Sequence, residues 1–194
     1  MKTCRLYSWN VNGLRAVVRK SHFFSFLKQE KPDVLCLQET KAHPDQLGAD
    51  VKDVNGYQAN FHWAQKKGYS GVATYSRPPA SRIACGLGLP HYDNEGRVLI
   101  HSYPSFTLFN VYFPNGKKNE ERLAYKMAFY KDFLQLVNQR MKKGEKNNTA
   151  SVSPAYRRSK LPFSIILASI SSSQPDIPKH PPADNRVPYK LHRV

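Results

Sequence analysis

Polar side chains that can hold a cation and a phosphate follow the apolar segments of this chain. They are Asn10 and Asn12 near the amino terminus, Glu39 in the next segment, and Tyr112 and Asn115 further along. A hard cation such as Mg²⁺ takes oxygen ligands, and one or two protein carboxylates suffice when a substrate phosphate and water complete its shell. Carboxamides orient water or phosphate oxygens, and a tyrosine donates a hydrogen bond or acts as a phenolate. These residue types predict a site for a divalent metal and a phosphate.

Each of these residues also has a structural interpretation, which the sequence leaves open. A lone carboxylate such as Glu39 beyond a strand end is commonly a solvated turn residue. Asn12 and Asn115 each precede a glycine, and Asn-Gly is a favoured turn pair. Tyr112 can be a half-buried strand aromatic, which is the commoner role of a tyrosine in that position.

Short apolar segments bounded by turn residues predict the strands that position this site. The predicted strands cover residues 5–11, 34–37, 58–63, 72–76, 97–102 and 106–113. The run at 34–37 is apolar throughout, which is typical of a strand that is buried on both faces. Glu39 lies just past its carboxyl end, where ligands gather in open α/β sheets.

Two helical segments accompany these strands. One is predicted between Gly13 and Pro32, and the other over residues 119–143. The second shows a regular apolar pattern at steps of four and three, formed by Leu123, Met127, Tyr130, Leu134, Val137 and Met141. That spacing predicts one amphipathic face, which we expect to pack against the core.

The composition is that of a basic globular protein. The chain has 194 residues, which suits one domain, and a formal net charge of +16. Such an excess of positive charge favours a polyanionic partner, most simply nucleic acid. A basic protein without such a partner remains the alternative, because charge runs are often only solvated surface.

Cysteine usage and the amino terminus bear on the compartment. Cys4, Cys36 and Cys85 are widely spaced and show no metal-ligand pattern, so we expect free thiols in a reducing compartment. The amino terminus lacks the apolar region of a signal peptide, and no apolar run is long enough to cross a membrane. We expect a cytoplasmic protein, associated with the nucleoid if bacterial and nuclear or organellar if eukaryotic.

Five motifs occur in order along the chain and carry a family resemblance. They are WNVNGLR at 9–15, PDVLCLQETK at 32–41, GYSGVATYSR at 68–77, EGRVLIHSY at 95–103 and FNVYFPNG at 109–116. Together they resemble the exonuclease III / apurinic-apyrimidinic endonuclease family of the endonuclease/exonuclease/phosphatase superfamily, over residues 3–146. The resemblance implies an α/β fold, a four-layer αββα sandwich of that superfamily's type, with its site at one end.

The resemblance also implies an activity and its partners. It implies hydrolysis of DNA 5′ to abasic sites and 3′–5′ exonuclease activity, with Mg²⁺ or Mn²⁺ as cofactor. The expected partner is double-stranded DNA with abasic sites or 3′ ends, and we expect a monomer with no membrane contact. By family correspondence, Glu39 binds the metal, Asn10 arranges metal and water, and Tyr112 contacts the scissile phosphate. The residues assigned to DNA or phosphate binding are Asn12, Lys41, Tyr69, Arg97 and Asn115.

The chain departs from the family pattern after residue 146. Relatives carry Gly-Asp-x-Asn and Ser-Asp-His elements that orient the attacking water, and neither occurs here. If the apolar segment 163–170 replaced the family strand, Ile170 and Ser172 would stand where the Asp and Asn belong. Residues 1–146 thus read as the amino-terminal portion of a nuclease domain. Residues 147–194 read as a divergent or truncated Pro/Ser-rich tail, loosely ordered apart from that one strand.

Three functional hypotheses follow from this departure. The first is a DNA repair nuclease of the exonuclease III type whose activity is at most trace, with the second half of its sandwich incomplete. The second is a catalytically inactive DNA-binding remnant. The third is another superfamily branch, such as an RNase-like enzyme or a phospholipid phosphatase, against which WNVNGLR and FPNG argue.

Overall fold

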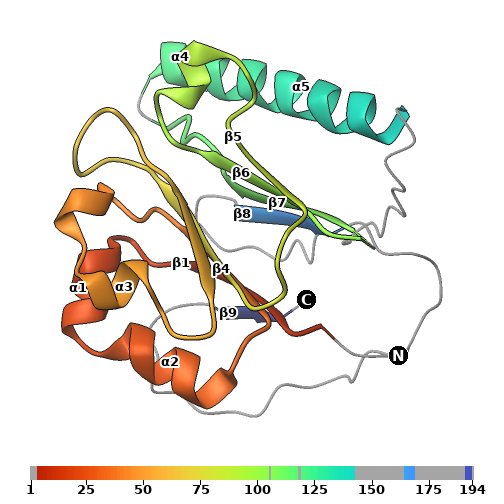
Figure 1. The fold of residues 1–194 in the computed structure, drawn as a ribbon. Coiled ribbons are helices and arrows are strands. Elements are labelled where there is room, and N and C mark those ends of the chain that lie inside the picture. Colours follow the sequence, from red (N-terminus) through yellow and green to blue (C-terminus); the bar gives the residue numbers. More distant parts are fainter. Residues whose placement is uncertain (1–3, 105, 118, 143–163, 169–190, 194) are drawn as a thin grey trace.

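Two β-sheets face each other in this protein, and helices cover their outer faces (Figure 1). The computed structural model describes residues 4–104, 106–117, 119–142, 164–168 and 191–193. The strand order is β3-β4-β2-β1-β9 in the first sheet and β5-β6-β7-β8 in the second. Helices α1, α2 and α3 lie against the first sheet, whereas α4 and α5 lie beyond the second. The predicted four-layer αββα sandwich is confirmed.

The first sheet is built around a fully buried strand. Its strands are β1 (Leu6–Asn10), β2 (Val34–Gln38), β3 (Gln58–His62), β4 (Val72–Ser76) and β9 (Leu191–Arg193). Strands β1 and β2 are parallel, and the other neighbours are antiparallel. Every residue of β2 is buried, as its continuous apolar run predicts. Leu35 and Leu37 face the helices, whereas Val34 and Cys36 face the second sheet, because side chains alternate along a strand.

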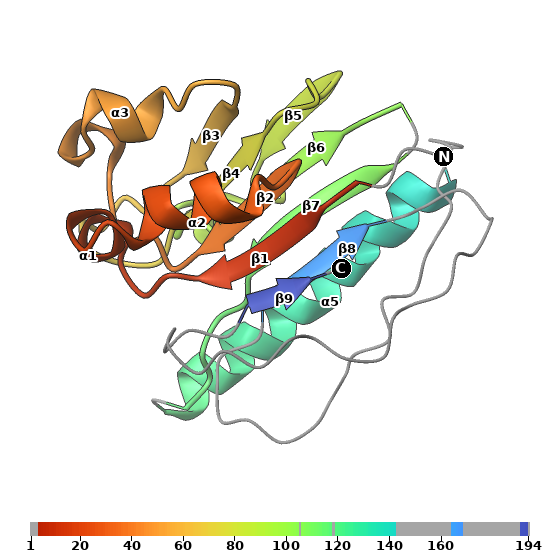
Figure 2. The ribbon, with the colours of Figure 1, turned by 90° about the horizontal axis from the view of Figure 1, so that it is seen from below.

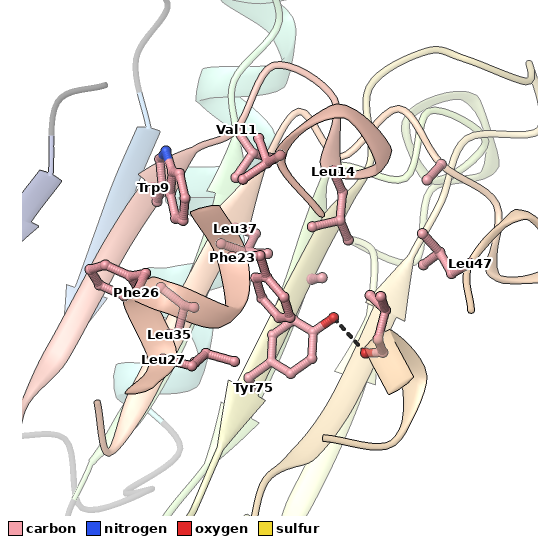
Figure 3. Close-up of a cluster of buried hydrophobic side chains, with 14 of the residues drawn as sticks. Trp9, Val11, Leu14, Phe23, Phe26, Leu27, Leu35, Leu37, Leu47 and Tyr75 are labelled. Carbon is pink, nitrogen blue, oxygen red and sulfur yellow. Dashed lines mark hydrogen bonds between the residues drawn. The ribbon is translucent and has the colours of Figure 1, made fainter. Parts of the chain in front are cut away.

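The helices of the first layer pack on that sheet through aromatic side chains. They are α1 (Leu14–Arg19), α2 (His22–Glu30), η1 (Pro44–Gln46) and α3 (Ala49–Lys52), so the predicted single helix after Gly13 is divided in two. Figure 3 shows Phe23 and Phe26 of α2 against Trp9 and Tyr75 of the sheet. The Tyr75 hydroxyl donates to the Val51 carbonyl at 2.9 Å, which ties α3 to β4.

The second sheet is antiparallel throughout and is covered by the long helix α5. Its strands are β5 (Arg82–Cys85), β6 (Val98–Ser102), β7 (Thr107–Tyr112) and β8 (Ser164–Ala168), with α4 (Pro90–Asp93) and α5 (Glu120–Lys142) outside. Figure 2 shows α5 running along the outer side of this sheet. In the described part of the chain, no helix combines the length and apolarity that a membrane span requires.

Helix α5 buries only part of the predicted face, since Tyr130 and Val137 pack against the core beside two phenylalanines outside that face. Phe129 and Phe133 are buried against the sheet, whereas Leu123, Met127 and Leu134 are between 50% and 59% exposed. Aromatic rings bury more apolar area than leucine or methionine. The phenylalanines therefore meet Phe109 and Phe113, and Tyr130 of the predicted face stacks on Phe113, whereas Leu123, Met127 and Leu134 stay exposed.

The predicted strand at 163–170 forms as β8, but its direction was not evident from the sequence. It pairs antiparallel to β7, with Ser164 opposite Tyr112 and Ala168 opposite Leu108. The carboxyl end of β8 therefore points away from Tyr112. Ile170 and Ser172 lie outside the described residues, as does most of the Pro/Ser-rich tail. One further described strand of the tail, β9, lies at the edge of the first sheet.

A buried amide network joins the two sheets at their centre. The Asn110 side chain donates to the Ala73 carbonyl at 2.8 Å and to Thr74 Oγ1 at 3.1 Å, and it accepts from Gln38 Nε2 at 2.9 Å. Gln38 also exchanges a hydrogen bond with Ser8. Asn110 and Gln38 are fully buried, so a group of this network that loses its partner has no water to replace it.

Replacing Asn110 by alanine should lower the free energy of unfolding by about 3 kcal/mol, because several buried polar groups are left unpaired together. Urea denaturation of the variant measures this effect. Asn55→Ala, at an exposed asparagine of the α3–β3 loop, is the matched control and should change stability by less than about 0.5 kcal/mol. Equal stability of the two variants would contradict a central role for the network.

His101 lies between the sheets without a hydrogen-bond partner among the described residues. It is fully buried on β6, and both its ring nitrogens lack a partner there. Its ring stacks on Tyr103 at a centroid distance of 6.4 Å. Burial lowers the pKa of His101 from 6.5 to about 4, because the charged imidazolium would lose its hydration.

Stability should therefore fall as the pH drops from 6.5 towards about 4. Over this window the unfolded chain takes up a proton at His101 and the folded chain does not, and the decrease levels off below the folded pKa. His101→Leu should reduce the acid sensitivity in denaturation midpoints measured across the window. His91→Leu, at an exposed histidine, is the control, and an unchanged pH slope in His101→Leu would contradict this assignment.

Candidate metal and phosphate site

The strand register brings the predicted site residues to one end of the first sheet. Asn10 pairs with Gln38, and Gln38 pairs with Val72 of β4, so these strand ends lie side by side. Glu39 follows Gln38 directly. The Gly13 amide donates to the Glu39 carbonyl at 2.8 Å, which holds the turn after β1 against the turn after β2.

The backbone at this end is strained. Asn12, Glu39, Lys41 and Ser70 all have positive φ, at 46°, 58°, 50° and 47°. Side-chain-bearing residues adopt this conformation rarely, and it costs about 1 kcal/mol or more each, so it persists only where the surroundings impose it. Such residues cluster at functional sites. In the described part of the chain only Ser21 and Lys31 share the feature, and both flank helix α2.

Glu39 and Lys41 form the charged centre of the site. The Lys41 ammonium lies 2.9 Å from Glu39 Oε1 and donates to Asn12 Oδ1 at 2.6 Å. Asn10 Oδ1 accepts a hydrogen bond from the Asn12 backbone amide at 3.0 Å. The side chain of Asn10 therefore closes the turn after β1, beside Glu39 and Lys41. The turn interpretation therefore applies to both asparagines, and their roles in metal and phosphate binding stay predictions.

Tyr112 faces Glu39 from the second sheet. Burial raises the pKa of Tyr112 well above its ordinary value, and the nearby Glu39 carboxylate raises it further by its charge and hydrogen bond. A phenol in this setting stays protonated at neutral pH. Of the two roles that the sequence leaves open, hydrogen-bond donor and phenolate, the raised pKa of Tyr112 favours the donor.

A network of two arginines and one glutamate fixes the neighbouring tyrosine. Glu95 pairs with Arg97 at 2.5 Å and with Arg122 at 2.9 Å. Both arginines donate to the Tyr69 hydroxyl, at 3.0 and 3.1 Å. Arg97 also donates to the Tyr112 carbonyl at 2.9 Å and is only 2% exposed, so its guanidinium joins Tyr69 to Tyr112.

Glu95 is the member of this network that sequence reasoning missed. Glu95 lies in the turn after α4, and Gly96 with a φ of 60° separates it from Arg97, so no strand periodicity in the sequence indicated this pairing. Burial alone would raise the pKa of Glu95, but the hydrogen bonds and charges of Arg122 and Arg97 outweigh burial and lower it. The carboxylate therefore stays ionised between its two cations.

Asn115 lies apart from this cluster in the present structure. It is exposed beyond β7, and its side-chain oxygen accepts the Lys117 amide at 3.0 Å. This is the local hydrogen bond of an asparagine-led turn. The turn interpretation accounts for its contacts, and its assignment to phosphate binding stays a prediction.

A basic hollow adjoins the site on the side of α1. Its volume is about 430 Å³, and its lining consists of Gly13, Arg15, Ala16, Arg19, Lys41 and Gly68. Arg15 and Arg19 lie one helical turn apart, so both present their cations to the same hollow. Their spacing in the sequence was a signal that the sequence analysis did not use.

The oxygen donors of the site fit a metal that brings much of its own coordination. Glu39 offers one carboxylate and Asn10 one carboxamide, which are hard donors of the type that Mg²⁺ takes. Within the described residues there is no group of three or more His, Cys, Asp or Glu placed to hold a metal ion. The site therefore suits a cation completed by water and a substrate phosphate better than a closed protein cage.

Comparisons with known proteins show the family of this chain. The sequence pattern of the Endonuclease/Exonuclease/phosphatase family matches residues 7–190. The chain belongs to this family. The resemblance to exonuclease III and abasic-site endonucleases is confirmed by relatives. The chain is 40% identical over 133 residues to an exodeoxyribonuclease of Bacillus subtilis, covering 69% of the chain and 52% of that protein.

Other family members show the same partial coverage. The chain is 39% identical over 132 residues to the DNA repair nuclease APEX1 of Danio rerio, covering 66% of the chain and 42% of that protein. The structure of the Neisseria 3′ phosphatase NExo bound to product DNA hairpin matches with a TM-score of 0.63 at 27% identity, covering 73% of the chain and 54% of NExo. The chain thus spans about half the length of these relatives.

Removing Glu95 should destabilise the protein by about 3 kcal/mol, because Arg97 would be left as a buried charge without its carboxylate. Glu95→Gln retains an acceptor oxygen and should be less destabilising than Glu95→Ala. Urea denaturation measures both. Glu121→Ala, at an exposed glutamate of α5, is the matched control, and a destabilisation by Glu95→Ala no larger than in this control would count against the network.

Proposed function

We propose that this chain binds DNA with abasic sites or 3′ ends at the site around Glu39 and Lys41, with at most trace Mg²⁺-dependent hydrolysis. The observation that carries the proposal is the position of Lys41. It pairs with the Glu39 carboxylate and also lines the basic hollow. A cation-binding carboxylate and a phosphate-binding surface therefore meet at one side chain. The DNA substrates named for the relatives support this assignment.

The basic hollow supports binding to a DNA backbone. Arg15, Arg19 and Lys41 present three cations around one depression, and the chain carries a net charge of +16. Contacts between such side chains and phosphates supply most of the sequence-independent affinity for DNA, through release of bound counterions. They also set the position of the protein on the strand.

The residues of the site have distinct roles in this proposal. Glu39 and Asn10 would hold Mg²⁺ or Mn²⁺, which when bound supplies positive charge at the phosphate. Tyr112 stays protonated and donates a hydrogen bond to a phosphate oxygen. Lys41 is available to a DNA phosphate once the Glu39 carboxylate has another partner, so cation binding and DNA binding support each other.

Trace hydrolysis follows from the chemistry that the sequence lacks. The Gly-Asp-x-Asn and Ser-Asp-His elements of the family do not occur in the 194 residues. Groups that orient or deprotonate an attacking water contribute about 10²–10⁴-fold each, and the effects of removing groups that act together do not add. DNA binding should thus be retained in this chain to a greater degree than catalysis, because the residues proposed to contact phosphates all lie within residues 1–146.

The test is to incubate the purified chain with a duplex that carries one abasic site, with Mg²⁺ or with EDTA, and to follow nicking and fluorescence anisotropy. We expect salt-dependent binding and nicking that barely exceeds the EDTA control. Strong nicking that disappears in both EDTA and Glu39→Ala would overturn the claim of trace activity.

Charge variants test the binding surface in the same assay. Arg15→Gln/Arg19→Gln should weaken binding and reduce the slope of log affinity against log salt by about 2, since each phosphate that is no longer neutralised lowers the slope by about one. Lys28→Gln/Lys52→Gln removes the same charge from exposed positions on α2 and α3 and is the matched control. An equal weakening in both double variants would mean that the hollow is not the binding surface.

A further inference from the structure

Trp63 is an exposed aromatic at the same end of the first sheet as Glu39. Its side chain is 40% exposed. His62 and Gln38 both pair with Val72 of β4, so Trp63 and Glu39 each begin the loop after a neighbouring strand end. With strands roughly 4.8 Å apart, these two residues start about 10 Å from each other.

The Trp63 loop is held firmly on the second sheet. The Gln65 amide donates to the Asn94 carbonyl at 2.9 Å, and the His62 ring bonds the Val98 carbonyl at 2.9 Å. Gly96 lies directly beneath, because a side chain there would collide with the Trp63 backbone. The position of Trp63 is therefore defined by contacts on both sides of its peptide.

The ring of Trp63 is supported at one side by the loop that carries Glu39. The His43 ring meets it edge-on at a centroid distance of 5.0 Å, with an interplanar angle of 69°. His43 in turn bonds Asp45 at 2.6 Å. An edge contact with one imidazole uses only part of an indole, so ring area remains open to a flat partner.

Two lysines follow Trp63 in the same loop. Lys66 and Lys67 are exposed three and four residues further along the same loop. Lys66 Nζ lies 5.9 Å from the ring centroid of Tyr69, which joins this loop to the arginine network beside the site. A fixed, open aromatic beside lysines is how proteins hold single-stranded nucleic acid, since bases stack on the ring and phosphates meet the cations.

We infer that Trp63 is a stacking platform for an unpaired nucleobase of the strand that occupies the Glu39 site. The inference rests on the proposed binding of DNA and adds a contact to a base, whereas the hollow contacts only phosphates. The occupant is a base at a frayed 3′ end, which is unpaired without an enzyme-driven opening of the duplex.

The test uses the fluorescence of the two tryptophans. Trp9 is only 2% exposed and serves as an internal reference, whereas stacking on Trp63 quenches its emission. The probes are a single-stranded DNA oligonucleotide and a deoxyribose-phosphate chain of equal length without bases. We expect quenching by the oligonucleotide and binding without quenching by the chain that lacks bases.

Variants separate stacking from charge. Trp63→Ala should bind the oligonucleotide roughly 5- to 150-fold more weakly and the chain without bases equally well. Lys66→Gln/Lys67→Gln should weaken both probes alike and keep the full quenching at saturation. Unchanged Trp9 emission shows that each variant is folded.

The outcomes distinguish this inference from the proposed function. Equal quenching by both probes, or an equal decrease in affinity for both in Trp63→Ala, would overturn the stacking platform alone. Binding to abasic duplex without quenching by the oligonucleotide would do the same and leave the proposed function standing. Failure of every DNA probe to bind would overturn both.

Discussion

The amide of Asn110 is the contact on which the arrangement of this protein depends. It reaches from the second sheet to the backbone and side chains of β2 and β4 in the first, deep in a layer that excludes water. Tyr112 lies two residues along the same strand and thus on the same face. Gln38, which donates to Asn110, is followed directly by Glu39. The network that joins the sheets therefore also sets Tyr112 opposite Glu39.

Each of the two carboxylates at the site is bound by basic side chains, and positive charge remains in excess. Glu39 is matched by Lys41, and Glu95 by Arg97 and Arg122. The chain as a whole has 30 basic and 14 acidic residues, so carboxylates cannot match all of its cations. This excess favours a polyanion. In the proposed function, the single carboxylate of Glu39 leaves the shell of a metal ion to be completed by water and a phosphate.

Some elements of this fold could be predicted from the sequence and others could not, and the difference has a physical reason. Strands such as β2 were predictable because a run of apolar residues between turn formers can be satisfied only by burial on both faces. Only part of the buried face of α5 was predictable, because periodicity counts apolar positions without weighing ring area. Tyr130 and Val137 pack against the core as expected, whereas Phe129 and Phe133 are buried and Leu123, Met127 and Leu134 are exposed. The direction of β8 was equally hidden, since strand propensity is the same in either orientation.

The family, and the residues proposed for metal and phosphate binding, could be inferred from the amino-acid sequence, because the residue types and motif order around Glu39 and Tyr112 match those of the family. Tertiary structure alone decided which of these residues meet. It joined Lys41 to Glu39, buried Arg97 between two tyrosines, and brought Trp63 to the edge of the site. These contacts connect residues far apart in the chain, and they depend on strand register and on the packing of one sheet upon the other. No local pattern of residues encodes either.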